Sequence, residues 1–113
     1  MNREALIQLR DAVREGTFID DIVLWEHDAL AYRAFSGSLD AAKALHEAVL
    51  HERTFVEIHW SKRCEEETRV SINRGLEGWA AAQSTNPARA WLLAILEALI
   101  AEASAAQFIG GRE

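Results

Sequence analysis

The feature that most constrains the fold is a change in the spacing of apolar residues after Leu50. In TFVEIHWS, residues 54–61, the apolar residues Val56, Ile58 and Trp60 occupy every second position. ETRVSINR, residues 67–74, repeats this alternation at Val70 and Ile72. A period of two is typical of a strand that is buried on one face, so we expect strands over about 54–61 and 67–74.

The chain between and after these segments predicts how the strands connect. A polar segment that includes KRCEE separates the first two strands, so they are expected to form a β-hairpin. Residues 78–84, GWAAAQS, give a weaker pattern because alanine favours helices, and we interpret them as a third strand. Strands that are grouped along the chain favour an antiparallel meander over a parallel sheet.

Elsewhere the apolar residues recur at the spacing of amphipathic helices. We expect helices over about 3–15, 18–30, 39–50 and 87–106. Thr17, with Asp20 three residues later, is a variant of the capping box and predicts the start of the second helix. Ser38 and the pair Asn86-Pro87 predict the starts of the third and fourth helices.

These elements predict a single α+β domain, residues 1–113, with a three-stranded antiparallel sheet packed with about four helices. The last helix carries more large apolar residues than one sheet face requires. Trp91, Leu93 and Ile100 widen a stripe that already contains Leu92, Ile95, Leu96, Leu99 and Ala103. Such a helix is either central in its own fold or partly covered by another subunit. In the second case, Trp91, Leu93 and Ile100 form the contact surface of a homodimer.

Composition excludes several classes of protein. Twelve basic residues stand against 18 acidic ones, so the formal net charge of −6 disfavours general binding to nucleic-acid backbones. Cys64 is the single cysteine and cannot form an internal disulfide. The first residues are charged throughout, and the longest apolar tract contains Glu97. We therefore expect a cytoplasmic protein with no signal peptide and no membrane span.

The stretch HEAVLHE, residues 46–52, resembles a zinc-protease motif with one residue too many. A helical zinc site needs two histidines four residues apart. His46 and His51 are five apart, which places them about 140° apart around a helix axis. We therefore expect two solvated histidines near a helix end, and no metal site.

Other chemically active residues are best explained by structural roles. The acidic runs at 20–21 and 65–67 show no sign of the burial that separates the pKa values of a catalytic pair. Ser36-Gly37-Ser38 lacks the glycine pattern of a nucleophile elbow or a phosphate loop. His27 and His59 are expected at the surface. We predict no catalytic residue, no metal and no cofactor.

The face of the hairpin opposite the apolar one offers another contact surface, which we expect to contain Phe55, His59, Arg69 and Asn73. Its basic residues could add contacts to single-stranded nucleic acid; they are Arg53, Lys62, Arg63, Arg69 and Arg74. Glu57 in the middle of this face and the acidic chain disfavour that function. Contact with another protein is therefore preferred, and nucleic-acid binding is the alternative.

The segment SGSLDAAKALHEAVL, residues 36–50, resembles the signature of the phage ABA sandwich domain family. That signature opens a helix, and the matching residues are Phe35, Ser36, Ser38, Leu39, Asp40, Ala41 and Ala42. The family's aromatic-rich antiparallel sheet is similar to TFVEIHW, and its closing Thr-Pro helix to TNPARAWLLAILEALIAE, where Asn86 is inserted. HERT, residues 51–54, departs from the Gly-Trp turn of the family. The resemblance, over about residues 17–103, implies a bacteriophage or prophage protein without an established activity.

Overall fold

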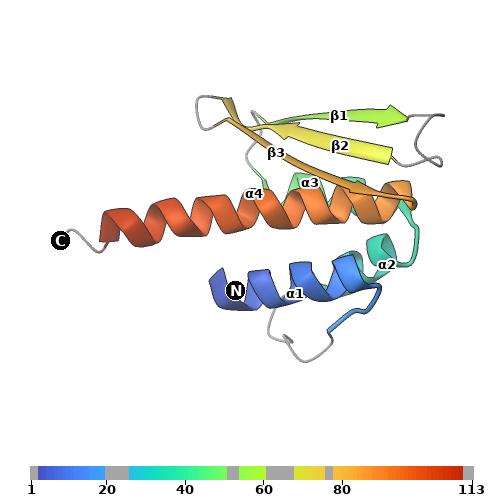
Figure 1. Cartoon of the computed structure of the whole chain (residues 1–113), viewed down its shortest axis with the longest axis horizontal. Coiled ribbons are helices and arrows are strands. Elements are labelled where there is room, and N and C mark those ends of the chain that lie inside the picture. The colour runs from blue at the N-terminus through green and yellow to red at the C-terminus, as the bar shows by residue number, and fades with distance from the viewer. Residues whose placement is uncertain (1–2, 20–25, 51–53, 61–67, 76–77, 111–113) are drawn as a thin grey trace.

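In the part of the chain that the structure describes, four helices combine with one antiparallel sheet. The computed structural model describes residues 3–19, 26–50, 54–60, 68–75 and 78–110. Within these ranges the elements follow in the order α1 (Arg3–Glu15), α2 (Asp28–Phe35), α3 (Leu39–Val49), β1 (Phe55–Trp60), β2 (Thr68–Asn73), β3 (Trp79–Ser84) and α4 (Pro87–Gly110). Figure 1 shows the sheet on one side of α4 and α1 on the other side. The predicted α+β class is confirmed.

The sheet has the order β1-β2-β3, and both pairings are antiparallel. The inward-facing rows place Val56 opposite Ile72 and Ile58 opposite Val70. Val70 and Ile72 of the central strand are completely buried, whereas Val56 and Ile58 of β1 are half-buried. The alternation in the sequence therefore predicted the buried face, and the third strand is confirmed. The hairpin tip at 61–67 and the side chain of Trp60 lie outside the described residues.

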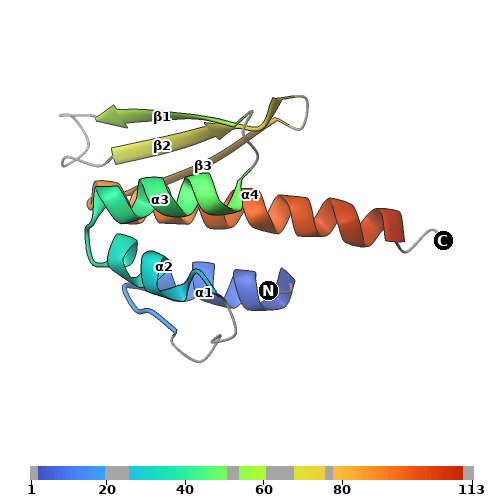
Figure 2. The ribbon, with the colours of Figure 1, turned by 180° about the vertical axis from the view of Figure 1, so that it is seen from behind.

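Helix α4 is the centre of the molecule. It packs against α1, α2, α3, β2 and β3, and Figure 2 shows the same arrangement from behind. The side chains of Leu92, Ile95 and Leu96 have no exposed surface. In the described part of the chain, α4 and the other helices lack the apolar length that crossing a membrane requires.

The connection between α1 and α2 differs from the prediction of a helix over 18–30. Gly16 has φ 93°, and the amide and hydroxyl of Thr17 both donate to the carbonyl of Ala12, at 2.9 and 3.1 Å. Thr17 thus closes α1 instead of opening a new helix. Residues 17–19 are not helical and α2 begins at Asp28; residues 20–25 lie outside the described part.

A tertiary contact accompanies the departure of this segment from the helical path. The ring of Phe18 packs against the rings of Tyr32 and Phe35 in α2, with centroids 5.3 and 5.6 Å apart. Contacts between a loop residue and a later helix leave no local periodic signal, so the capping-box pattern at Thr17 was misleading.

The other two predicted helix starts are confirmed. The hydroxyl of Ser38 accepts a hydrogen bond from the amide of Ala41 at 3.1 Å. The Oδ1 atom of Asn86 accepts from the amides of Ala88 and Arg89, at 3.0 and 3.2 Å. Both side chains satisfy amides that have no partner inside their own helix.

Candidate functional site

The face of the sheet turned away from α4 is open to solvent. Its cross-strand rows follow from the strand register. One row contains Phe55, Asn73 and Trp79, the next contains Glu57, Ser71 and Ala81, and the last contains His59, Arg69 and Gln83. We call these nine residues the open face. Four of them, Phe55, His59, Arg69 and Asn73, are the residues predicted from the hairpin, and the structure brings them together.

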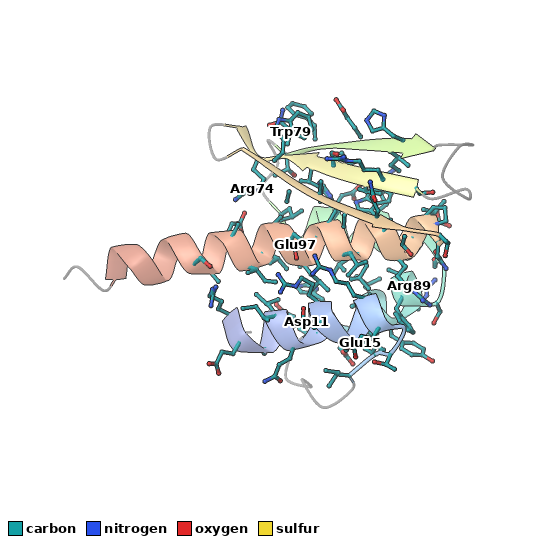
Figure 3. The ribbon with its side chains drawn as sticks, viewed as in Figure 1. Asp11, Glu15, Arg74, Trp79, Arg89 and Glu97 are labelled. Carbon is teal, nitrogen blue, oxygen red and sulfur yellow. The ribbon has the colours of Figure 1, made fainter. Side chains whose placement is uncertain are left out.

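Two large aromatic side chains stand on the open face. Phe55 of β1 is 66% exposed and Trp79 of β3 is 52% exposed. Both belong to the same row, on either side of the central strand. Figure 3 shows Trp79 on the side of the sheet away from α4. The sequence left the orientation of Trp79 open, and only its pairing with Asn73 places it beside Phe55.

The side chain of Asn73, between these rings, has a structural task. Its Oδ1 accepts a hydrogen bond from the amide of Gly75 at 2.8 Å, and Gly75 has φ 72°. The amide of Arg74 donates to the carbonyl of Gly78 in the same turn, at 2.8 Å. Asn73 therefore shapes the β2–β3 turn, and its amide oxygen is already engaged.

Charges on the open face nearly cancel. The carboxylate of Glu57 lies 3.3 Å from Nε2 of His59 on the same strand, and Arg69 is the cross-strand neighbour of His59. The side chains of Glu57 and His59 are more than half exposed, so solvent screens their interaction. The open face is therefore close to neutral, in contrast to the chain as a whole. Of the other predicted basic contacts, Arg74 is half-buried in the β2–β3 turn, whereas Arg53, Lys62 and Arg63 lie outside the described residues.

The predicted contact surface on the last helix is wrong. Trp91, Leu93 and Ile100 are buried, with 8%, 3% and 8% of their surface exposed. They are covered by the chain's own elements, because α4 lies between the sheet and α1 (Figure 1). Of the two explanations for the wide apolar stripe, the central position is the correct one.

The expectation that His46 is solvated is also wrong. His46 is 8% exposed, and its Nδ1 lies 3.2 Å from Nε1 of Trp91. On the other side of the ring, Nε2 lies 2.9 Å from Oγ1 of Thr54. The helix-end pattern indicated solvent, but Trp91 lies 45 positions further along the chain, so the sequence contains no local sign of this contact. His51, the other histidine of the motif, lies outside the described residues.

The two remaining histidines have different surroundings. His59 is exposed on β1, as predicted. His27 is less exposed than expected and lines a pocket of about 410 Å³ between α1, α4 and the end of α3. The polar residues of this pocket are Glu26, His27 and Glu102, and its other lining is apolar. In the described part of the chain, no group of three or more His, Cys, Asp or Glu residues could hold a metal ion.

Comparisons of the chain with known protein families, with curated proteins and with solved structures find no match. The geometry of the open face is therefore the basis for the functional proposal.

Proposed function

We propose that the protein is a non-catalytic binding module that contacts another protein through the open face of its sheet. The observation that carries this proposal is the pair of exposed rings, Phe55 and Trp79, in one cross-strand row. The other face of the sheet supplies residues to the core, and these two rings lie outside the core. Burial of an aromatic side chain contributes about 1.5–3 kcal/mol, which this fold leaves available for a partner.

The surroundings of the rings also favour a protein partner. Centres of protein interfaces are poor in charged residues and rich in aromatic residues. The open face combines two rings with small or neutral side chains, including Ser71, Ala81 and Gln83, and its two formal charges are of opposite sign. Because the face belongs to a hydrogen-bonded sheet, its backbone is ordered before binding, which lowers the entropy cost of association.

The biological setting of the proposal rests on the resemblance of residues 35–42 to the phage ABA sandwich domain signature. On this basis we propose that the protein belongs to a bacteriophage or prophage and that its partner lies in the cytoplasm of the bacterial host. The acidic chain, with a net charge of −6, favours a basic partner through long-range attraction.

Capture from a bacterial lysate by the immobilised chain tests this function, provided that matched variants are compared. Phe55→Thr/Trp79→Thr removes both rings and keeps residues that suit strands. Tyr32→Ala removes a ring that is exposed to nearly the same extent as Trp79, at 50% against 52%, but lies on α2. We expect one protein that binds the wild type and Tyr32→Ala, and binds the double variant at least about tenfold more weakly after purification and titration. Equal binding of all three forms would contradict the proposal.

Single-stranded nucleic acid is the second candidate for the same face. Two exposed rings on the outer strands β1 and β3, with Arg69 of the central strand two rows away, suit base stacking and phosphate contact. Glu57 in the middle row and the net charge of −6 act against this function. Fluorescence anisotropy of labelled oligonucleotides at low salt distinguishes the two candidates. A salt-sensitive complex that is lost in Arg69→Glu would favour nucleic acid over protein.

A further inference from the structure

Strand β1 forms an edge of the sheet, and among the described residues no strand pairs with its outer side. In Figures 1 and 2, β1 lies at the rim of the molecule in both views, farther from α4 than the other strands. The outward-pointing backbone N–H and C=O groups of an edge strand can hydrogen-bond to a further strand. This edge is therefore available for sheet extension.

The inner face of β1 is less well covered than that of its neighbour. Helix α4 packs on β2 and β3, and the inward side chains of β2 are fully buried. In contrast, Val56 and Ile58 of β1 are only half-buried. An added strand that brings apolar side chains to the same side would cover them.

We propose that β1 pairs with β1 of a second copy, antiparallel and about a twofold axis at Ile58, so that two sheets join into one. In an antiparallel pair, residues that are directly opposite lie on the same face of the sheet. The axis at Ile58 places Ile58 opposite the partner's Ile58 on the inner face. On the outer face it places Glu57 opposite the partner's His59, and the symmetry produces this pair twice.

The chemistry of β1 selects this register over its neighbours. Glu57 and His59 already attract each other within one strand, at 3.3 Å. Directly opposite residues of paired strands have Cβ atoms about 5 Å apart, closer than two residues that are two positions apart along one strand, at about 7 Å. An axis at Glu57 would place two carboxylates opposite each other, which is destabilising. An axis at His59 would pair fewer residues of the strand.

The other edge of the sheet offers no comparable complementarity. Strand β3 packs directly on α4. Its outward residues are Trp79, Ala81 and Gln83, which carry no charges that could select a register. The inference therefore concerns β1, and it does not depend on the proposed contact of the open face with another protein.

Sedimentation velocity of the full chain, from low to about 100 µM concentration, tests the pairing. We expect a dimer that is weakened about tenfold by Glu57→Lys and by His59→Glu, because each change loses the attraction in two symmetric pairs. The double variant E57K/H59E places opposite charges across the two strands, so the attraction is present again and the dimer should return. Gln83→Lys adds a charge to the same face at the other edge, and should leave the dimer unchanged.

Three results would overturn the inference. The wild-type chain could be monomeric over the whole concentration range, both single variants could leave the dimer unchanged, or the double variant could fail to form the dimer again. Circular dichroism of each variant verifies that the fold is retained. Phe55→Thr/Trp79→Thr is expected to dimerise normally, so loss of the protein partner and loss of the dimer are separate outcomes.

Discussion

At the scale of single residues, His46 illustrates how burial selects a protonation state. The indole N–H of Trp91 can only donate a hydrogen bond, so the Nδ1 atom of His46 that it contacts must be the acceptor. The remaining ring nitrogen, Nε2, then carries the hydrogen and donates it to the hydroxyl of Thr54. Burial lowers the pKa of His46 below its ordinary value of 6.5, although nearby Glu47 acts in the opposite direction. His46 is thus held neutral in the folded protein.

This arrangement predicts that the free energy of unfolding decreases as the pH falls below 6.5. In that range the unfolded chain binds a proton at His46 and the folded chain does not, so acid favours unfolding until the lowered pKa is reached. Urea unfolding at about pH 5.5 and 7.5 measures the effect. His46→Gln should reduce the difference between the free energies of unfolding measured at these two pH values. His59→Gln changes an exposed residue and should leave that difference as it is in the wild type.

Replacement of Trp91 tests the hydrogen bond itself. Trp91→Phe keeps an aromatic ring but leaves the buried Nδ1 atom of His46 without its donor, and is expected to cost about 1–3 kcal/mol of stability. Trp79→Phe makes the same exchange on the open face, where it should change the free energy of unfolding by less than about 0.5 kcal/mol. Equal effects in urea unfolding would show that the contact with His46 contributes nothing.

At the scale of elements, residues at the start of α4 contact the α2–α3 corner, residues 35–38, and hold it against the rest of the fold. The guanidinium of Arg89 donates two hydrogen bonds to the carbonyl of Phe35, at 3.1 and 3.0 Å. Its Cζ atom also lies 4.0 Å from the centroid of the Phe35 ring. Gly37 has φ 115°, and a Cβ added there would lie 3.3 Å from Nδ2 of Asn86. One residue, Asn86, therefore caps α4 and also lies against the corner.

Loss of this cap should weaken the whole fold, because α4 contacts most of the other elements. Asn86→Ala is expected to reduce the free energy of unfolding by about 1 kcal/mol. Asn86→Asp retains a side-chain acceptor for the amides of Ala88 and Arg89 and should be close to the wild type. Thermal unfolding followed by circular dichroism distinguishes the two, and a similar loss in both variants would contradict the role of the cap.

A second link joins α1 to α4. Arg10 bonds to Glu97 at 2.9 Å, and Arg14 lies 3.4 Å from the same carboxylate. Figure 3 labels Glu97 on α4 and Asp11, the other partner of Arg10, on α1. Burial lowers the pKa of Arg10, but its hydrogen bonds to Asp11 and Glu97 more than offset this effect and raise the pKa. The link is partly exposed, so it orients α1 more than it stabilises the fold.

At the scale of the whole molecule, the central position of α4 determines what mutations in this helix do. Leu93→Ala is expected to reduce the free energy of unfolding by about 2–5 kcal/mol, because it creates a cavity in the core. Leu39→Ala, at a residue that is 44% exposed, should have a much smaller effect. Urea unfolding measures both. If Leu93→Ala changed the oligomeric mass and not the stability, the helix would be an interface after all.

How much of the fold could be predicted depends on how far apart in the chain the interacting residues are. Alternation at Val70 and Ile72 depends on the pleat of a single strand, and the caps at Ser38 and Asn86 depend on a few neighbouring residues, so all were visible in the sequence. Thr17 carried an equally clear local pattern, yet it closes α1. The packing of Phe18 on Tyr32 and Phe35 accompanies this different path, and it joins residues distant in the chain.

The sequence by itself determined which residues form the sheet, which of their faces is apolar and where two of the helices begin, because these properties depend on local spacing and local hydrogen bonds. Only the tertiary structure decided that α4 is central, that His46 is buried and that Phe55 and Trp79 share one exposed row. Each of these features requires segments far apart in the chain to meet, and their packing is a property of the assembled core.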